Sequence, residues 1–163
     1  MSSLSRVASE SRQYDRVLFL MRHGHAEDAP GIDFDRELTA AGREAVGRTC
    51  AWLSKCDVHP THIIASPLVR ATQTAVLVKD HLALKSTIVT WDEIGPGGQC
   101  SHVAAKLEHE DGMALLVTHQ PFVGRFIEYL TGKLIAMDTA KIASIRTVSF
   151  EQSCGDVEWV SKD

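Results

Sequence analysis

The chain has 163 residues, the length of one domain with room for a hydrophobic core. Its hydrophobic fraction of 44% and charged fraction of 23% are those of a soluble globular protein. The formal net charge of −4 excludes a chain that is basic overall, so we expect neither a nucleic-acid partner nor a membrane partner.

The first 15 residues are polar, rich in serine and free of apolar periodicity. We expect a mobile arm over residues 1–15 and one catalytic domain over residues 16–163. No secretory signal pattern and no bilayer-length apolar stretch is present, and the four cysteines show neither a C-x-x-C pair nor a metal-site spacing. We therefore expect a cytoplasmic protein with free thiols.

A run of five apolar residues, Val17 to Met21, predicts a buried strand from about Arg16 to Met21. The run stops abruptly at Arg22, His23 and Gly24. Glycine has no Cβ, so the backbone there can turn tightly and approach a ligand. Open α/β sheets bind ligands at such strand ends, although a merely solvated strand end would show the same residues.

The first helix is predicted from an N-cap at Thr39 to about Ser54. Gly42 and Gly47 each weaken this helix by up to about 1 kcal/mol, and we expect them to serve close packing. Its apolar stripe comprises Val46, Cys50 and Leu53.

A second apolar run predicts a strand over residues 62–65, and the chain again becomes polar at Ser66. Ser66 suits an N-cap, and Pro67 suits the first position of the helix that follows. Arg70 then lies in the first turn of that helix, close to the end of the strand.

The third quarter of the chain repeats this pattern. A strand over residues 87–90 precedes a loop rich in glycine and proline, and a short helix is predicted over residues 101–110. The next apolar run, residues 113–117, leads to His119, and Pro121 begins another helix.

Two final strands, over residues 142–150 and 157–160, are predicted with a turn near Gly155 and Asp156. The order of strand, polar residue and helix occurs three times, with helical crossovers between the strands. We therefore predict an α/β fold: a three-layer α/β/α single domain with a mostly parallel central sheet and an antiparallel C-terminal edge.

Right-handed crossovers bring the ends of successive parallel strands to the same edge of the sheet. We therefore expect Arg22, His23, Arg70 and His119 to meet in one crevice, where two guanidinium groups and two imidazoles favour a phosphate. A zinc site built from His23, His25 and His119 is the main rival. The arginines would repel a dication and no further ligand has a suitable spacing, so we expect no metal.

Five stretches of the chain resemble the histidine phosphatase superfamily, which includes the phosphoglycerate mutase-like enzymes. The motif Arg-His-Gly after the first strand is similar to the signature of that superfamily. The order, spacing and small size resemble the SixA-type phosphohistidine phosphatases. The matching stretches are residues 22–24, 36–42, 66–75, 117–124 and 138–145.

The resemblance implies that His23 is the nucleophile and becomes phosphorylated. It implies that Arg22, Arg70 and His119 are catalytic and bind the phosphate, with Gly24 also binding it, and that a phosphate or sulfate would fit the site. It implies a metal-independent phosphatase without a cofactor. The expected substrate is a phosphohistidine-bearing signalling protein, and the alternative substrate is a small phosphorylated metabolite.

The proton donor is less well defined by the sequence. Larger relatives use a carboxylate in a loop. The nearest candidates here are Asp92 and Glu93, of which Glu93 has the position expected for such an acid. A solvated loop carboxylate is an equally good interpretation of Glu93. A phosphoramidate nitrogen needs less acid assistance than an alkoxide, so the lack of a clear acid favours phosphohistidine. A phosphate-binding regulatory module without turnover stays as an alternative, and a mutase, which needs a closed pocket, is disfavoured.

Overall fold

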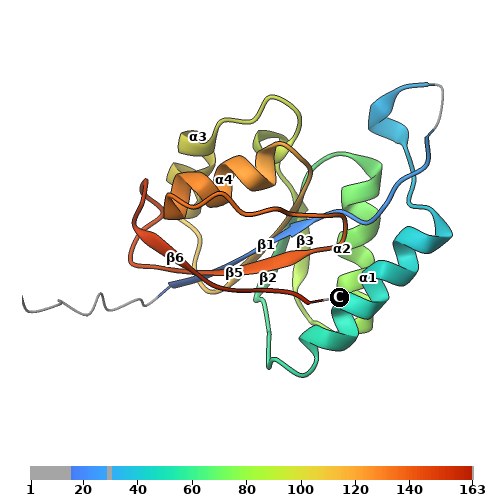
Figure 1. The fold of residues 1–163 in the computed structure, drawn as a ribbon, viewed down its shortest axis with the longest axis horizontal. Coiled ribbons are helices and arrows are strands. Elements are labelled where there is room, and N and C mark those ends of the chain that lie inside the picture. Colours follow the sequence, from blue (N-terminus) through green and yellow to red (C-terminus); the bar gives the residue numbers. More distant parts are fainter. Residues whose placement is uncertain (1–15, 29–30, 163) are drawn as a thin grey trace, which may run out of the picture.

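The computed structural model describes residues 16–28 and 31–162, so the arm predicted over residues 1–15 lies outside the described residues. A single six-stranded sheet has the strand order β3-β2-β4-β1-β5-β6 (Figure 1). Strands β1 to β4 run parallel to one another, whereas β5 is antiparallel to both of its neighbours, β1 and β6. The strands are β1 (Arg16–Arg22), β2 (His62–Ala65), β3 (Thr87–Thr90), β4 (Ala114–Thr118), β5 (Ile142–Thr147) and β6 (Gly155–Val160).

Four α-helices cover the two faces of this sheet (Figure 1). Helices α1 (Ala40–Leu53) and α2 (Val69–His81) pack on one face, and α3 (Cys100–Leu107) and α4 (Phe122–Thr131) on the other. Two short 3-10 helices, η1 (Asp33–Asp35) and η2 (Asp92–Ile94), lie in loops.

Strand β1 shows how the core holds the layers together, because its side chains alternate between the two faces. Leu18 and Leu20 pack in the cluster that contains α3 and α4, while Phe19 and Met21 pack in the cluster that contains α1 and α2. Full burial of such a side chain contributes about 1.5–3 kcal/mol to stability, so this central strand is firmly fixed. The predicted three-layer α/β/α fold with an antiparallel edge is confirmed.

The ends of three helices show where the sequence signals hold and where they fail. Thr39 caps α1 as predicted, since its side chain accepts a hydrogen bond from the backbone of Gly42. The predicted N-cap at Ser66 is wrong: α2 begins at Val69 and Leu68 precedes it in an extended conformation. Leu68 is buried in the core, and its backbone N–H donates to Oγ of Ser66 at 3.4 Å in the turn before the helix. Helix α3 ends at Leu107, three residues before the predicted end, and Leu107 is its last buried residue.

The C-terminal hairpin also differs from the prediction. Gly155 and Asp156 begin β6, and residues 148–154 make the turn that was expected near those two residues. Phe150 leaves the sheet because its ring is buried beneath the guanidinium of Arg16, 4.2 Å from the ring centroid. Its backbone N–H donates to the carboxylate of Glu108.

Among the described residues, no helix is both long enough and apolar enough to cross a membrane.

Candidate active site

The site lies where neighbouring parallel strands end. Strands β1 and β4 pair with Arg22 opposite Thr118, so the residues that follow, His23 and His119, lie side by side at this edge. The backbone N–H of His23 donates to the carbonyl of Thr118 at 2.9 Å and fixes that register. Strand β2 lies beside β4, and α2, which follows it, presents Arg70.

A cavity of about 420 Å³ opens at this strand edge. The predicted residues Arg22, His23, Arg70 and His119 all line it, so the structure brings these four side chains together. The remaining lining residues are His25, Ala26, Asp33, Arg36, Gln120 and Thr139.

The surroundings of His23 define which ring nitrogen is available for attack. Its Nδ1 lies 2.6 Å from the carbonyl oxygen of Gly24, and a carbonyl only accepts, so Nδ1 carries the hydrogen. Its Nε2 accepts a hydrogen bond from Nε of Arg70 at 3.1 Å and therefore bears a lone pair. The nitrogen that carries the lone pair is thus Nε2, which faces a guanidinium.

The charge state of His23 follows from the same surroundings. Burial lowers its pKa from 6.5 to about 4, and the hydrogen bond to Gly24 opposes that shift. The positive charges of Arg70 and Arg22 lower the pKa further. The imidazole is therefore neutral at pH 7, the state in which it can act as a nucleophile.

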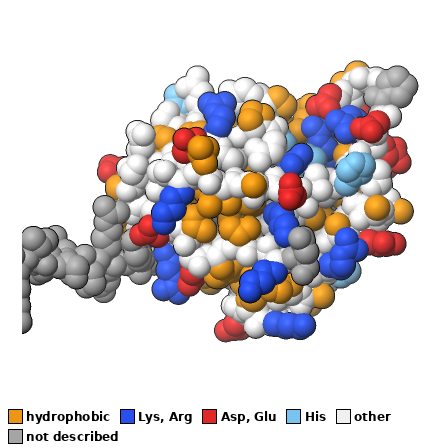
Figure 2. Space-filling view, in the orientation of Figure 1, with side chains coloured by type: hydrophobic (Ala, Val, Ile, Leu, Met, Phe, Trp, Pro, Cys, Tyr) orange, Lys and Arg blue, Asp and Glu red, His pale blue; other side chains and the backbone are white. Residues whose placement is uncertain are grey.

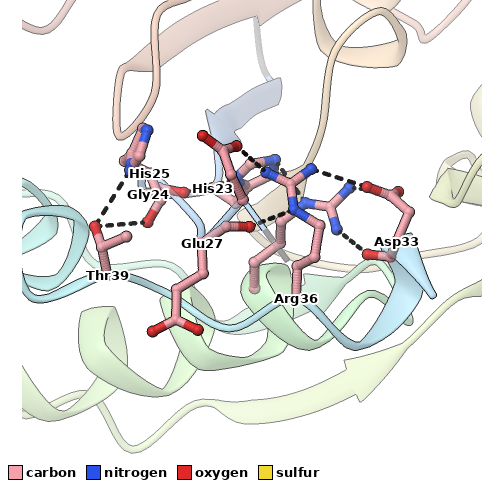
Figure 3. A network of polar contacts seen from close by, with 9 residues as sticks. His23, Gly24, His25, Glu27, Asp33, Arg36 and Thr39 are labelled. Atoms are coloured by element: carbon pink, nitrogen blue, oxygen red, sulfur yellow. Dashed lines mark hydrogen bonds and ion pairs between the residues drawn. The ribbon is translucent and has the colours of Figure 1, made fainter. Parts of the chain in front are cut away.

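The buried side chain of Arg70 is held by a carboxylate as well as by His23. Its Nη2 contacts Oδ2 of Asp33 at 3.1 Å, and its Nη1 donates to the carbonyl of Asp33 at 2.6 Å. The other carboxylate oxygen, Oδ1, accepts from Arg36 at 2.9 Å. Figure 3 shows Asp33 and Arg36 together on one side of His23, with His25 and Thr39 on the other. One carboxylate thus bridges two guanidinium groups, as a phosphate would.

Asp33 and Arg36 were not among the predicted site residues. Arg36 hydrogen-bonds the side chain of Asp33, and this contact and that of Arg70 lower the pKa of Asp33 below its usual value. The acidic residue three positions before an arginine, within the acidic loop beside the site, was the available sequence signal. That signal alone does not say which way either side chain points.

Arg22 keeps a donor for a further ligand, and His119 offers one when its ring is protonated. Nδ1 of His119 donates to the carbonyl of Gln120 at 2.9 Å, and Nη1 of Arg22 donates to the carbonyl of Met137 at 3.0 Å. Nε2 of His119 and Nε of Arg22 are buried and have no hydrogen-bond partner among the described residues. An oxyanion in the cavity can satisfy Nε of Arg22, and also Nε2 of His119 when that ring is protonated.

Gly24 was expected to bind phosphate, but the structure gives it another use. Gly24 is not a lining residue, and its N–H donates to Oγ1 of Thr74 at 3.1 Å. A Cβ at Gly24 would lie 2.8 Å from the carbonyl oxygen of Gly42, so the glycine allows the chain to pass close to α1. The need for glycine here is one of packing between two backbone segments.

Glu93, the candidate proton donor, is not among the lining residues of the cavity. Its Oε1 forms an ion pair with Nζ of Lys106 at 2.9 Å. This contact lowers the pKa of Glu93, whereas a proton donor at neutral pH needs a raised pKa. His25, in contrast, is an exposed lining residue at the rim of the cavity.

The electrostatic character of the cavity follows from its lining. Three arginines and three histidines face one carboxylate, Asp33. Among the residues that the structure describes, no group of three or more His, Cys, Asp or Glu side chains is placed to hold a metal ion. The arrangement suits a tetrahedral oxyanion, because arginine presents a planar fork of donors to such oxygens.

Comparisons with known proteins agree with this chemistry. A model of the histidine phosphatase superfamily (branch 1) matches residues 18–95. The phosphohistidine phosphatase SixA of Escherichia coli (strain K12) is 32% identical over 143 residues, which cover 83% of this chain and 86% of that protein. A SixA homologue of Haemophilus influenzae is 33% identical over 127 residues, covering 71% and 77%. The solved structure of a protein histidine phosphatase SixA complexed with tungstate has a TM-score of 0.81 and 28% identity, covering 90% of this chain and 96% of that one.

Proposed function

The chain belongs to the histidine phosphatase superfamily and is a phosphatase, and we propose that it uses His23 as its nucleophile to hydrolyse phosphohistidine in another protein. One observation carries the proposal. The neutral imidazole of His23 holds its lone pair on Nε2, directly against the guanidinium of Arg70, in a cavity lined by arginine and histidine.

In the first step, Nε2 of His23 attacks phosphorus and forms a nitrogen–phosphorus bond, while the bond from phosphorus to the substrate imidazole breaks. The electron pair of the broken bond stays on the substrate nitrogen. Arg22 and Arg70 neutralise charge on the three equatorial phosphoryl oxygens, and His119 adds a donor when it is protonated. Water then attacks phosphorus, releases inorganic phosphate and restores the free imidazole of His23.

The substrate class follows from the leaving group. Asp33 is the one carboxylate that lines the cavity within the described part of the chain. Its pKa is lowered, so it is ionised at neutral pH and is a poor proton donor. An alkoxide leaving group needs such a donor, whereas the substrate's imidazole can be protonated on its other nitrogen before the bond breaks. This difference favours phosphohistidine over a sugar phosphate.

The named relatives support the same reading. Two of them are a phosphohistidine phosphatase SixA and its homologue. The solved SixA structure is a complex with tungstate, a tetrahedral oxyanion with the charge of a phosphate dianion. The cluster of Arg22, Arg70 and His119 is suited to bind the same kind of ion.

The test compares wild type with His23→Asn on a phosphohistidine peptide and on an aryl phosphate, both with EDTA present. Wild type should hydrolyse the peptide, and the variant should lose at least about a thousandfold in kcat while keeping its fold by circular dichroism. A rapid quench should trap an acid-labile phosphoenzyme whose phosphate is on Nε2, as read by ³¹P NMR. Turnover by His23→Asn at the wild-type rate would overturn the proposal that His23 is the nucleophile.

The two alternative functions give different results in the same experiment. Hydrolysis of the aryl phosphate but not of the peptide would indicate that the substrate is a small phosphorylated metabolite. Binding of inorganic phosphate without turnover of either compound would assign the protein to a regulatory, phosphate-binding class.

A further inference from the structure

A second cavity, of about 460 Å³, lies beside the active site. Thr139 lines both cavities, so the two adjoin. We call the second one the basic cleft, and it is defined by its charged lining residues Arg48, Lys55, Lys141 and Lys162. Figure 2 shows several Lys and Arg side chains on this face, around the C-terminal end of the chain and over α1.

The concentration of positive charge in the basic cleft is unusual for this chain, whose net charge is −4. Among the residues that the structure describes, no Asp or Glu lines the cleft. Within residues 16–28 and 31–162, Arg48, Lys55 and Lys162 form no ion pair. Elsewhere on the surface Lys106 and Lys133 are each paired with a carboxylate. The cleft therefore presents a local positive potential to solvent.

The backbone around Ala140 lies between the cleft and the catalytic residues and contacts both sides. The N–H of Ala140 contacts the carbonyl oxygens of Arg22 at 3.1 Å and His23 at 3.0 Å. On the other side, the carbonyl of Ala140 accepts from Oγ1 of Thr49 on α1 at 2.9 Å. The N–H of Arg22 donates to the carbonyl of Lys141 at 3.0 Å. A chain that enters the active site with a phosphorylated side chain has only this strip to cross before it meets the cleft.

The composition of the cleft indicates what it binds. Ala45, Ala51 and Trp52 supply apolar surface between the cations, which suits the mixed side chains of a polypeptide. A nucleic acid would need a broader basic surface than a chain of net charge −4 provides.

We propose that the basic cleft docks an acidic segment next to the phosphohistidine of the protein substrate. This inference rests on the proposed function, because it names a property of the same substrate. It makes the cleft a determinant of which phosphoprotein the enzyme prefers, through charge complementarity outside the catalytic cavity.

The test uses two synthetic phosphohistidine peptides that differ only in the four residues on each side of the histidine. These residues are glutamates in one peptide and glutamines in the other. Wild type should hydrolyse the glutamate peptide with a kcat/KM about tenfold higher, which corresponds to about 1.4 kcal/mol. The preference should fall as ionic strength rises.

Charge-reversal variants test whether the cleft residues cause the preference for the glutamate peptide. The ratio of kcat/KM for the glutamate peptide to that for the glutamine peptide should fall in Lys55→Glu and fall further, towards one, in Lys55→Glu/Lys162→Glu. The kcat/KM for the glutamine peptide should stay unchanged. Lys85→Glu is the matched control, since Lys85 is exposed, does not line the cleft and undergoes the same change of charge.

Each other outcome counts against the proposal. Equal kcat/KM on the two peptides, with both hydrolysed by wild type, would overturn the docking site and leave the proposed function intact. A preference that Lys85→Glu reduces as much as Lys55→Glu does would show a general charge effect and would also overturn it. Hydrolysis of neither peptide would overturn both proposals. Binding of a single-stranded oligonucleotide that Lys55→Glu abolishes, without a peptide preference, would assign the cleft to nucleic acid instead.

Discussion

Nε of Arg70 donates a 3.1 Å hydrogen bond to Nε2 of His23, so the guanidinium lies on the lone pair that we propose attacks phosphorus. The two residues come from different parts of the sheet edge, one from the loop after β1 and the other from the first turn of α2. This contact holds the imidazole in one orientation, while the other two guanidinium nitrogens donate to the carbonyl and the carboxylate of Asp33. A phosphoryl group that displaced the carboxylate of Asp33 would accept from the nitrogen that the carboxylate now holds. Nucleophile and oxyanion binding are therefore coupled through one side chain.

Replacing the guanidinium of Arg70 by an ammonium keeps the positive charge and removes the planar arrangement of donors, so it tests which of the two catalysis needs. We expect Arg70→Lys to lower kcat by about a hundredfold, because lysine keeps the charge but lacks the planar fork and Nε–H. Steady-state turnover of a phosphohistidine peptide measures the effect. Arg43→Lys on the exposed surface of α1 is the control and should leave kcat unchanged. A wild-type kcat in Arg70→Lys would show that the contact with His23 is not needed.

The carboxylate of Asp33 occupies the same two guanidinium groups, of Arg70 and Arg36, that an oxyanion would use. We therefore expect Asp33→Asn to bind inorganic phosphate and tungstate several-fold more tightly, because the ion no longer competes with a bound carboxylate. Competitive inhibition of turnover measures both affinities.

The matched control for that substitution is Asp35→Asn, which removes the same charge from an exposed residue of η1 that does not line the cavity. It should tighten inhibition much less. Equal tightening in both variants would mean that net charge alone sets phosphate affinity and that the Asp33 contact is incidental.

The lowered pKa of His23 also predicts how stability depends on pH. The unfolded chain binds a proton at this residue below about pH 6.5, whereas the folded protein binds it only below about pH 4. Between these values the unfolded state holds more protons, so the free energy of unfolding falls as pH drops from about 6.5 to 4. The loss is at most about 3 kcal/mol.

Urea unfolding at a series of pH values, for wild type and His23→Asn, isolates this contribution as the difference between the two curves. Direct titration of the His23 ring by NMR should give a midpoint well below 6.5. A midpoint near 6.5, or parallel stability curves, would contradict the effect of burial on this imidazole.

The strand ends that carry Arg22, His23 and His119 were predictable because β1 and β4 are buried on both faces. Such strands appear in the sequence as continuous apolar runs, and the polar residue after each run then marks the edge of the sheet. Arg70 followed from the position of α2 relative to β2. Their convergence in one site was predictable because a parallel arrangement brings these strand ends to the same edge of the sheet.

The contacts of the loop before α1 were not predictable in the same way. Asp33 meets Arg70 across 37 positions of sequence, and no periodicity relates a loop side chain to a helix so far along the chain. Likewise, the turn after β5 is set by the burial of Phe150 against Arg16, which depends on the folded sheet. Gly24 was predicted to allow close approach of a ligand, and the group that lies close to it in the structure is the carbonyl of Gly42 in α1.

Two glycines of α1 give a paired test of this close packing. A Cβ at Gly42 would lie 2.1 Å from the carbonyl oxygen of His25, whereas a Cβ at Gly47 would meet the ring of His81 at an ordinary 3.4 Å. We expect Gly42→Ala to destabilise the protein by about 3 kcal/mol and to lower kcat, because the segment that follows His23 must shift. Gly47→Ala should instead be neutral or stabilising by up to about 1 kcal/mol, as alanine is the better helix former.

Urea denaturation measures both free energies of unfolding, and peptide turnover shows whether the catalytic segment has moved. The Gly47→Ala variant controls for the general effect of alanine in this helix. If the two substitutions gave the same change in stability, the segment after His23 would have room to retreat from α1. In that case the position of the nucleophile would depend on its contacts with Gly24 and Arg70 rather than on the helix beneath it.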